Sequence, residues 1–93
     1  MYTIVTPKQF LRYAGRFFKK HPDLKPRFAK IVSDLQRDPF QLHQEIHPLS
    51  GKLSGCHAVS LTHSYHITLT LHITEKEIIL LDIGTHDAVY GKK

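Results

Sequence analysis

The residues best suited to chemistry gather in two short stretches, "HPLSGKLSG" (47–55) and "IGTHDAVY" (83–90). The second stretch sets a hydroxyl, the imidazole of His86 and a carboxylate directly after an apolar strand, with the phenol of Tyr90 close behind. Histidine titrates near neutral pH and can act as a general acid or base. The first stretch combines His47 and Lys52 with glycines and serines, a composition typical of a loop. Together they predict a ligand site on a polar sheet face, flanked by this loop and this tail.

Metal binding and nucleophilic catalysis fit the pattern less well. His63 and His66 would point to opposite faces of a strand, and His66 and His72 share a face but lie about 20 Å apart. We therefore expect no metal site and no cofactor. No Ser-His-Asp or Cys-His spacing stands out, and no phosphate-binding glycine loop of the nucleotide-fold type occurs. The remaining histidines are interpreted as scattered surface residues: His21, His43, His57 and His72.

The length of 93 residues predicts one domain, spanning residues 1–93. The single cysteine, Cys56, excludes an internal disulfide and favours a reducing compartment. The N-terminus lacks the apolar core of a signal peptide, and no apolar run reaches the roughly 20 residues of a membrane helix. We expect a cytoplasmic protein that does not contact a membrane.

The charge is unevenly distributed. Residues 1–46 carry nine Lys and Arg against four acids, whereas residues 47–93 carry four of each and six of the eight histidines. A basic first half is typical of a protein that binds polyanions, although it is also compatible with simple solubility.

Two helices are expected in the first half. The first begins with a capping box at Thr6 to Gln9, with Pro7 in its first turn. The second starts between Pro22 and Lys25, runs to about Arg37, and ends at Asp38-Pro39. The connection is short, so the two helices are expected to form an antiparallel hairpin. Their apolar stripes are Phe10, Leu11, Ala14, Phe17 and Phe18 in the first helix, and Leu24, Phe28, Ile31, Val32 and Leu35 in the second.

In the second half, apolar and polar residues alternate with the period of two that is typical of β-strands. Residues 65–73 alternate, which puts Tyr65, Ile67, Leu69, Leu71 and Ile73 on a buried face and His66, Thr68, Thr70 and His72 on the other. Strands at 56–61 and 77–84 flank it, with a turn at 74–77, and residues 2–5 form a short edge strand. The run 78–81 is apolar throughout, which indicates a central strand. The helices cover one face, and the other shows His66, Thr68 and Ser60 to solvent. Residues 40–55 are expected to be mostly loop, with one short helical turn.

The loop "HPLSGKLSG", the strands after it and the tail "LDIGTHDAVY", in this order, resemble the RelE/ParE toxin superfamily, and most of all its RelE branch of YafQ-like toxins. The likeness covers nearly the whole chain. Each motif is short, but the ordered pair at this spacing is specific. The resemblance implies an α+β, RelE-like fold, with a helix hairpin packed on a small antiparallel sheet. The periodicity of the residues predicts the same arrangement.

The resemblance implies the toxin of a type II toxin–antitoxin pair, a metal-independent endoribonuclease (mRNA interferase) that cuts mRNA in the ribosomal A site. Such cleavage needs a base for the 2′-hydroxyl, an acid for the leaving 5′-oxygen and cations for the phosphorane. By resemblance, His47 and His86 take the acid–base roles. Tyr90 occupies the terminal aromatic position and Lys52 lies in the basic loop. Each residue also has a purely structural interpretation. In that interpretation His47 caps the loop, His86 holds the tail by a hydrogen bond, and Tyr90 packs as an apolar side chain at the C-terminus.

The chain departs from the family pattern at three positions. Members commonly carry Arg or His near Ser60 and Arg near His66, and YafQ-like toxins have Asp where Ser64 falls. His66 is a cation only when it is protonated. His63 or His66 would have to compensate for the charged side chains that the family carries and this chain lacks. Two alternatives therefore stay open: a ParE-like toxin that inhibits DNA gyrase without chemistry, and a degenerate toxin that retains only antitoxin binding. The intact "GTHDAVY" tail favours the ribonuclease.

The implied partners are a cognate antitoxin, the ribosome and mRNA, and operator DNA only through the antitoxin. The expected RNA-binding and ribosome-binding residues are Lys52, Ser60 and His63 together with the basic side chains of the first helix, Arg12, Arg16, Lys19 and Lys20.

Overall fold

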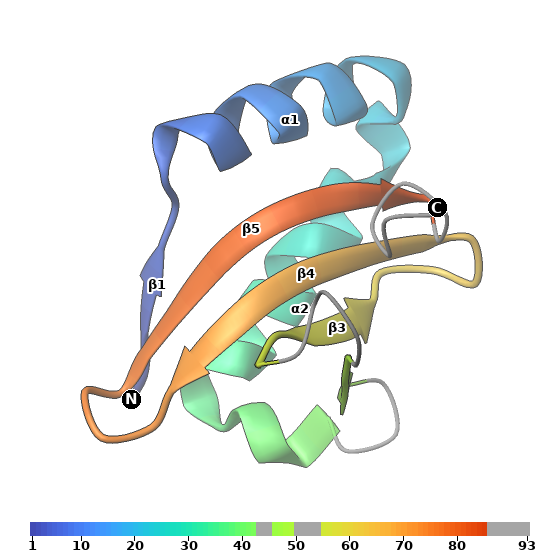
Figure 1. The fold of residues 1–93 in the computed structure, drawn as a ribbon. Coiled ribbons are helices and arrows are strands. Elements are labelled where there is room, and N and C mark those ends of the chain that lie inside the picture. Colours follow the sequence, from blue (N-terminus) through green and yellow to red (C-terminus); the bar gives the residue numbers. More distant parts are fainter. Residues whose placement is uncertain (43–45, 50–54, 86–93) are drawn as a thin grey trace.

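Two helices pack on one face of a curved sheet (Figure 1). The computed structural model describes residues 1–42, 46–49 and 55–85. In chain order the elements are β1 (Thr3–Val5), α1 (Lys8–Lys20), the 3-10 helix η1 (Pro22–Leu24), α2 (Lys25–Arg37), the 3-10 helix η2 (Pro39–Leu42), β2 (Ile46–Pro48), β3 (His57–Ser60), β4 (Tyr65–His72) and β5 (Glu77–Thr85). The predicted α+β class and the helix pair on a mainly antiparallel sheet are confirmed.

The described strands form one sheet in the order β1-β5-β4-β3-β2. β1 pairs in parallel with β5, and every other pair is antiparallel. The prediction of a short N-terminal edge strand is therefore confirmed. The Tyr2 N–H donates to the Gln36 carbonyl at 2.8 Å, which ties the start of β1 to the end of α2.

A register shift in β5 changes which of its residues face the core. Thr68 is paired with Asp82 and Leu69 with Leu80, so Leu81 is an extra residue opposite this step. A bulge of this kind reverses the inward–outward alternation. Along β5, Ile78 and Leu80 face the core before the bulge, and Ile83 faces it afterwards. β5 lies between β1 and β4, as its apolar composition predicted.

The start of α1 differs from the prediction. The helix begins at Lys8 with Pro7 as the N-cap, and no side chain within the described ranges caps it. The expected capping box is wrong because the helix starts one residue later than predicted. The Gln9 amide nitrogen instead donates to the hydroxyl of Tyr13. Leu11 is also outside the core, with 54% of its surface exposed.

The core lies between the helices and one face of the sheet. Phe10 and Ala14 of α1 and Ile31 and Leu35 of α2 pack against the inward side chains of β3, β4 and β5. The two helices meet through Phe28, whose ring stacks with that of Phe10 at 6.4 Å and contacts that of Phe18 edge-on at 5.1 Å. In Figure 1 they diverge from the η1 turn, so they share this aromatic contact rather than a long parallel seam. No helix in the described ranges is long and apolar enough to cross a membrane.

The structure differs from the prediction in the loop before β3 and at the end of β4. Residues 39–42 form η2, which agrees with the predicted helical turn, but 46–48 form the edge strand β2. Its three residues are too few for a periodic signal. At the other end of β4, Ile73 was expected on the buried face. It lies in the turn after the strand and is 58% exposed.

Candidate functional site

Two neighbouring rows of side chains cross the sheet on the face away from the helices. Ser60 is opposite His66, which is opposite Gly84. In the next row His47 is opposite Ala58, followed by Thr68 and Asp82. Alternate residues of a strand point to opposite faces, and the residues between these belong to the core. We call the face formed by His47, Ser60, His66, Thr68 and Asp82 the polar sheet face.

The centre of the polar sheet face is not open, contrary to the prediction. His66 is 8% exposed and Thr68 is 3% exposed, whereas Ser60 is half-buried. The alternation of apolar and polar residues correctly predicted which face each side chain takes. It cannot report whether that face is covered, because a period of two records direction alone. β4 is the middle strand, so both of its edges are also occupied by neighbours.

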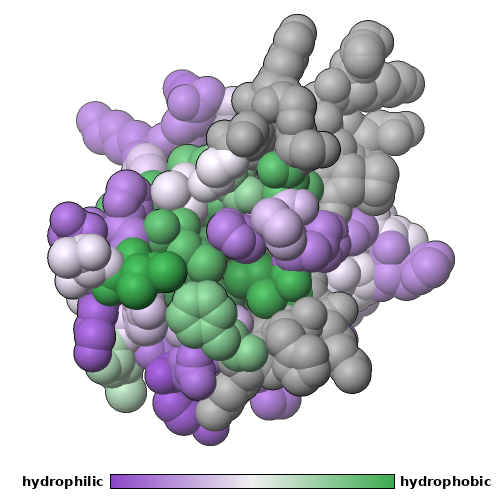
Figure 2. All heavy atoms as spheres, turned by 60° about the horizontal axis from the view of Figure 1, so that its bottom comes forward, coloured by the Kyte–Doolittle hydropathy of each residue, from purple (hydrophilic) through white to green (hydrophobic). Residues whose placement is uncertain are grey.

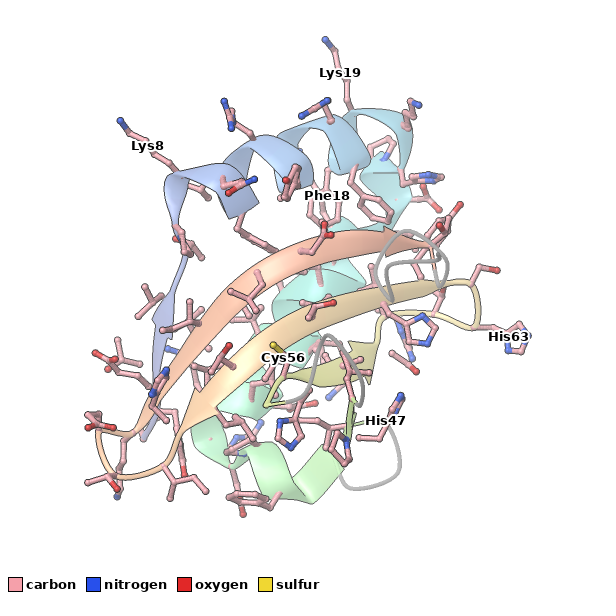
Figure 3. All side chains as sticks on the ribbon, in the orientation of Figure 1. Lys8, Phe18, Lys19, His47, Cys56 and His63 are labelled. Atoms are coloured by element: carbon pink, nitrogen blue, oxygen red, sulfur yellow. The ribbon has the colours of Figure 1, made fainter. Side chains whose placement is uncertain are left out.

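His47 lies at the exposed margin of the same face. It is on β2, at the edge of the sheet, and its side chain is exposed. β2 is two strands from β4, so the spacing of strands puts the Cα atoms of His47 and His66 roughly 10–12 Å apart. Figure 3 shows His47 beside the short β2 strand, and His63 in the turn that leads from β3 to β4.

Asp82 adds a carboxylate to the polar sheet face that the sequence analysis did not select. Burial raises the pKa of its carboxyl group above 3.8, and the Ile83 N–H, which donates to Oδ1 at 2.7 Å, partly opposes this. The sequence signal was available, because Asp82 interrupts an apolar strand two residues before Gly84.

His57 is not the surface histidine that was expected. It is paired with Leu69 and faces the helix side of the sheet, in a cavity of about 230 Å³ lined by Phe40, Ile46, Pro48 and Leu71. Figure 2 shows apolar surface on the side of the molecule that carries η2. Burial, and then the nearby His47, lower the pKa of His57 from 6.5. Its buried Nδ1 has no hydrogen-bond partner among the described residues.

The other predicted site residues fall into three groups. Arg12, Arg16, Lys19 and Lys20 are exposed on α1, away from the polar sheet face. His63 lies in the turn between β3 and β4, and in Figure 3 it points away from the sheet. Lys52, His86 and Tyr90 lie outside the described residues. The structure thus brings together His47, Ser60 and His66.

Within residues 1–42, 46–49 and 55–85, no three His, Cys, Asp or Glu side chains lie close enough together to hold an ion. Cys56, the free cysteine, precedes His57 in sequence but belongs to no such group.

This helix pair on a five-stranded sheet is the fold seen in the solved structures of YafQ and of other RelE-type and ParE-type toxins, as the two motifs indicated. The structure matches that of YafQ from E. coli with a TM-score of 0.79 and 19% identity, covering 98% of this chain and all of YafQ. YafQ in the E. coli DinJ–YafQ complex matches with a TM-score of 0.78 over the same coverage, also at 19% identity.

A further similar structure is that of the conserved hypothetical protein HP0892 from Helicobacter pylori. It is 26% identical, with a TM-score of 0.68, and the match covers 96% of this chain and 99% of HP0892. No family model and no curated protein matches the sequence. The similarity is therefore carried by the fold, and at these identities the chemistry must be argued from the residues themselves.

Proposed function

We propose that this chain is the toxin of a type II toxin–antitoxin pair and acts as a ribosome-dependent mRNA endoribonuclease. The observation that carries the proposal is the near end-to-end match to YafQ, alone and in its complex with DinJ. The match spans 98% of this chain and all of YafQ, so it involves the whole fold and not a single shared motif.

The proposed partner is a small antitoxin protein. Support comes from the DinJ–YafQ complex, in which the matched fold is bound to a second protein. The charge of this chain fits such a partner, because an excess of five positive charges favours association with an acidic or mixed segment. Operator DNA would be contacted through the antitoxin.

The proposed chemistry is general acid–base cleavage of a phosphodiester at the polar sheet face. His47 is exposed at its margin and His66 lies two strands away, and this separation leaves room for a phosphate group between two imidazoles. Because His66 is buried, we place it beneath the reacting phosphate and do not assign it the role of a solvent-exposed cation. By resemblance, His86 and Tyr90 complete the site and Lys52 supplies a cation.

The same fold also matches a protein named as a YoeB/ParE toxin from Agrobacterium tumefaciens, at 15% identity and a TM-score of 0.71. A gyrase-binding toxin without chemistry is the alternative function. It requires neither His47 nor His86, and this difference makes the two functions separable by experiment.

Primer extension on an mRNA that is being translated in vitro tests the proposal. We expect wild-type protein to cut the message only when ribosomes are present, and His86→Ala to abolish the cuts. His72→Ala is the matched control, since His72 is exposed at the end of β4. Absence of cuts with folded protein would contradict the ribonuclease, and a supercoiling assay with DNA gyrase would then test the alternative.

A further inference from the structure

A groove separate from the polar sheet face lies between the C-terminal half of α1 and the ends of β4 and β5. Its volume is about 590 Å³, within the usual range for a small-molecule site. Arg16, Phe17, Lys20 and His21 contribute from the helix side, and Tyr65 and Thr85 from the strands. We call it the aromatic groove.

The sequence of α1 turns a stripe of side chains toward this groove. Tyr13, Arg16, Phe17 and Lys20 are spaced at i, i+3, i+4 and i+7, so they lie on one side of the helix. The stripe combines aromatic and basic residues, whereas the neighbouring stripe of Phe10, Ala14 and Phe18 is apolar. Tyr13 and Phe17 also pack against the core, so the groove runs along the edge of the core and adds basic side chains to it.

Three of the aromatic rings that line the groove contact one another. The ring centroids of Phe17 and Tyr65 are 5.1 Å apart, those of His21 and Tyr65 are 4.8 Å apart, and those of Phe17 and His21 are 4.7 Å apart. All three residues are half-buried, so part of their surface remains accessible. The backbone of Tyr65 is fixed, because its carbonyl accepts hydrogen bonds from the N–H groups of Leu61 and Thr62.

Cations but no acids accompany these rings. Arg16, Lys19 and Lys20 line the groove, and no Asp or Glu does so among the described residues. Lys19 points away from the body of the molecule in Figure 3, which leaves Arg16 and Lys20 as the cations of interest. Lysines at the end of a helix also stabilise its dipole. That explanation accounts for Lys20 but not for Arg16, and packing against the core accounts for the buried part of the Phe17 and Tyr65 rings.

We infer that the aromatic groove is a binding subsite for a base of single-stranded RNA, with Tyr65 as the stacking platform and Arg16 and Lys20 contacting the adjacent phosphates. Aromatic faces combined with cations are the usual means of holding single strands, since every base can stack and every linkage is charged. Gly84 and Thr85 line the groove, and the next residue in the sequence is His86. The inference rests on the proposed function and extends it, because it places a neighbouring nucleotide of the substrate beside the proposed reaction site.

An NMR titration of the ¹⁵N-labelled full chain tests the subsite without requiring cleavage. The probes are a single-stranded RNA tetramer and an abasic tetramer with the same number of phosphates. We expect the base-bearing RNA to shift the amides of Tyr65, Gly84 and Thr85 and the abasic one to bind about tenfold more weakly. Tyr65→Leu should weaken binding of the base-bearing RNA by a similar factor, and Tyr65→Phe, which keeps the ring, should not.

Two variants that each remove one positive charge provide the second control. Lys20→Gln should weaken binding of both tetramers and reduce its salt dependence, whereas Lys8→Gln, which removes the same charge from a side chain outside the groove, should have little effect. Equal binding of the two tetramers, or a folded Tyr65→Leu variant that binds as wild type, would overturn the subsite while ribosome-dependent cleavage could still occur. Base-dependent binding without cleavage on ribosomes would keep the subsite and remove the proposed function.

Discussion

Ser60 of β3 lies directly opposite His66 of β4, and both side chains take the face of the sheet that the helices leave uncovered. A hydroxyl therefore stands next to the buried imidazole at the centre of the polar sheet face. A phosphorane held beside His66 would need its stabilising cation from another position, because Ser60 carries no charge.

This relationship predicts a gain of activity. Ser60→Arg adds a fixed positive charge next to His66, and we expect the rate of ribosome-dependent cleavage to rise roughly tenfold. Ser60→Gln, which adds length without charge, should leave the rate within a factor of about three of wild type. The rates are measured by primer extension on a translated message. Equal rates for the Arg and Gln variants would contradict a role for charge at this position.

His57 predicts a dependence of stability on pH. Its folded-state pKa is lowered by burial, so the unfolded chain binds more protons as pH falls below 6.5. The free energy of unfolding should therefore decrease as pH drops through 6.5 toward the folded pKa. His57→Leu, which suits the apolar cavity, should flatten this dependence, and His72→Gln, on an exposed residue, should not. Urea unfolding between pH 5 and pH 8 measures the slope, and an unchanged slope in His57→Leu would refute the assignment.

Asp82 predicts a dependence of the opposite sign. Burial raises its folded-state pKa, so the folded chain holds the proton more tightly and loses stability as pH rises above 3.8. Asp82→Asn removes this penalty and keeps an acceptor for the Ile83 N–H. We expect its melting temperature to exceed that of wild type by a few degrees at pH 7, and the difference to shrink toward pH 4. The surface variant Asp23→Asn should bring no such gain. A lower melting temperature for Asp82→Asn at pH 7 would contradict this account.

The two leucines that the sequence placed in helical stripes should respond very differently to truncation. Leu35 is fully buried in the core, so Leu35→Ala should lower the free energy of unfolding by about 2–5 kcal/mol. Leu11 is 54% exposed, and Leu11→Ala should cost less than about 1 kcal/mol. Urea unfolding at pH 7 compares them directly. Similar losses for the two variants would mean that the core is not where the structure places it.

Much of the fold could be predicted because the elements carry strong periodic signals. The alternation from Tyr65 to Leu71 predicted the faces of β4, and Pro22 and Pro39 bracket the second helix. β2 was missed because three residues are too short for any period to be visible. The bulge at Leu81 could not be inferred from the unbroken apolar run, which also fits a strand buried on both faces.

The candidate site was only partly predictable. The histidines at 47 and 66 were selected from residue type and resemblance, and register brings them to one face. The burial of His66, and of Thr68 beside it, depends on what covers the sheet, which a pattern along one strand does not record. Asp82 lies inside the tail motif and Tyr65 in the alternating strand, but neither was selected as a site residue, because their significance comes from neighbours on other elements.

The central claim is that the histidines of the polar sheet face carry out cleavage on the ribosome. The most direct measurement is the single-turnover rate of cleavage of a ribosome-bound mRNA by wild type, His47→Gln and His72→Gln. Loss of an acid or base is expected to slow cleavage by roughly a hundredfold or more in His47→Gln and to leave the rate of His72→Gln unchanged. A His47→Gln variant that is folded and cuts at the wild-type rate would contradict the claim.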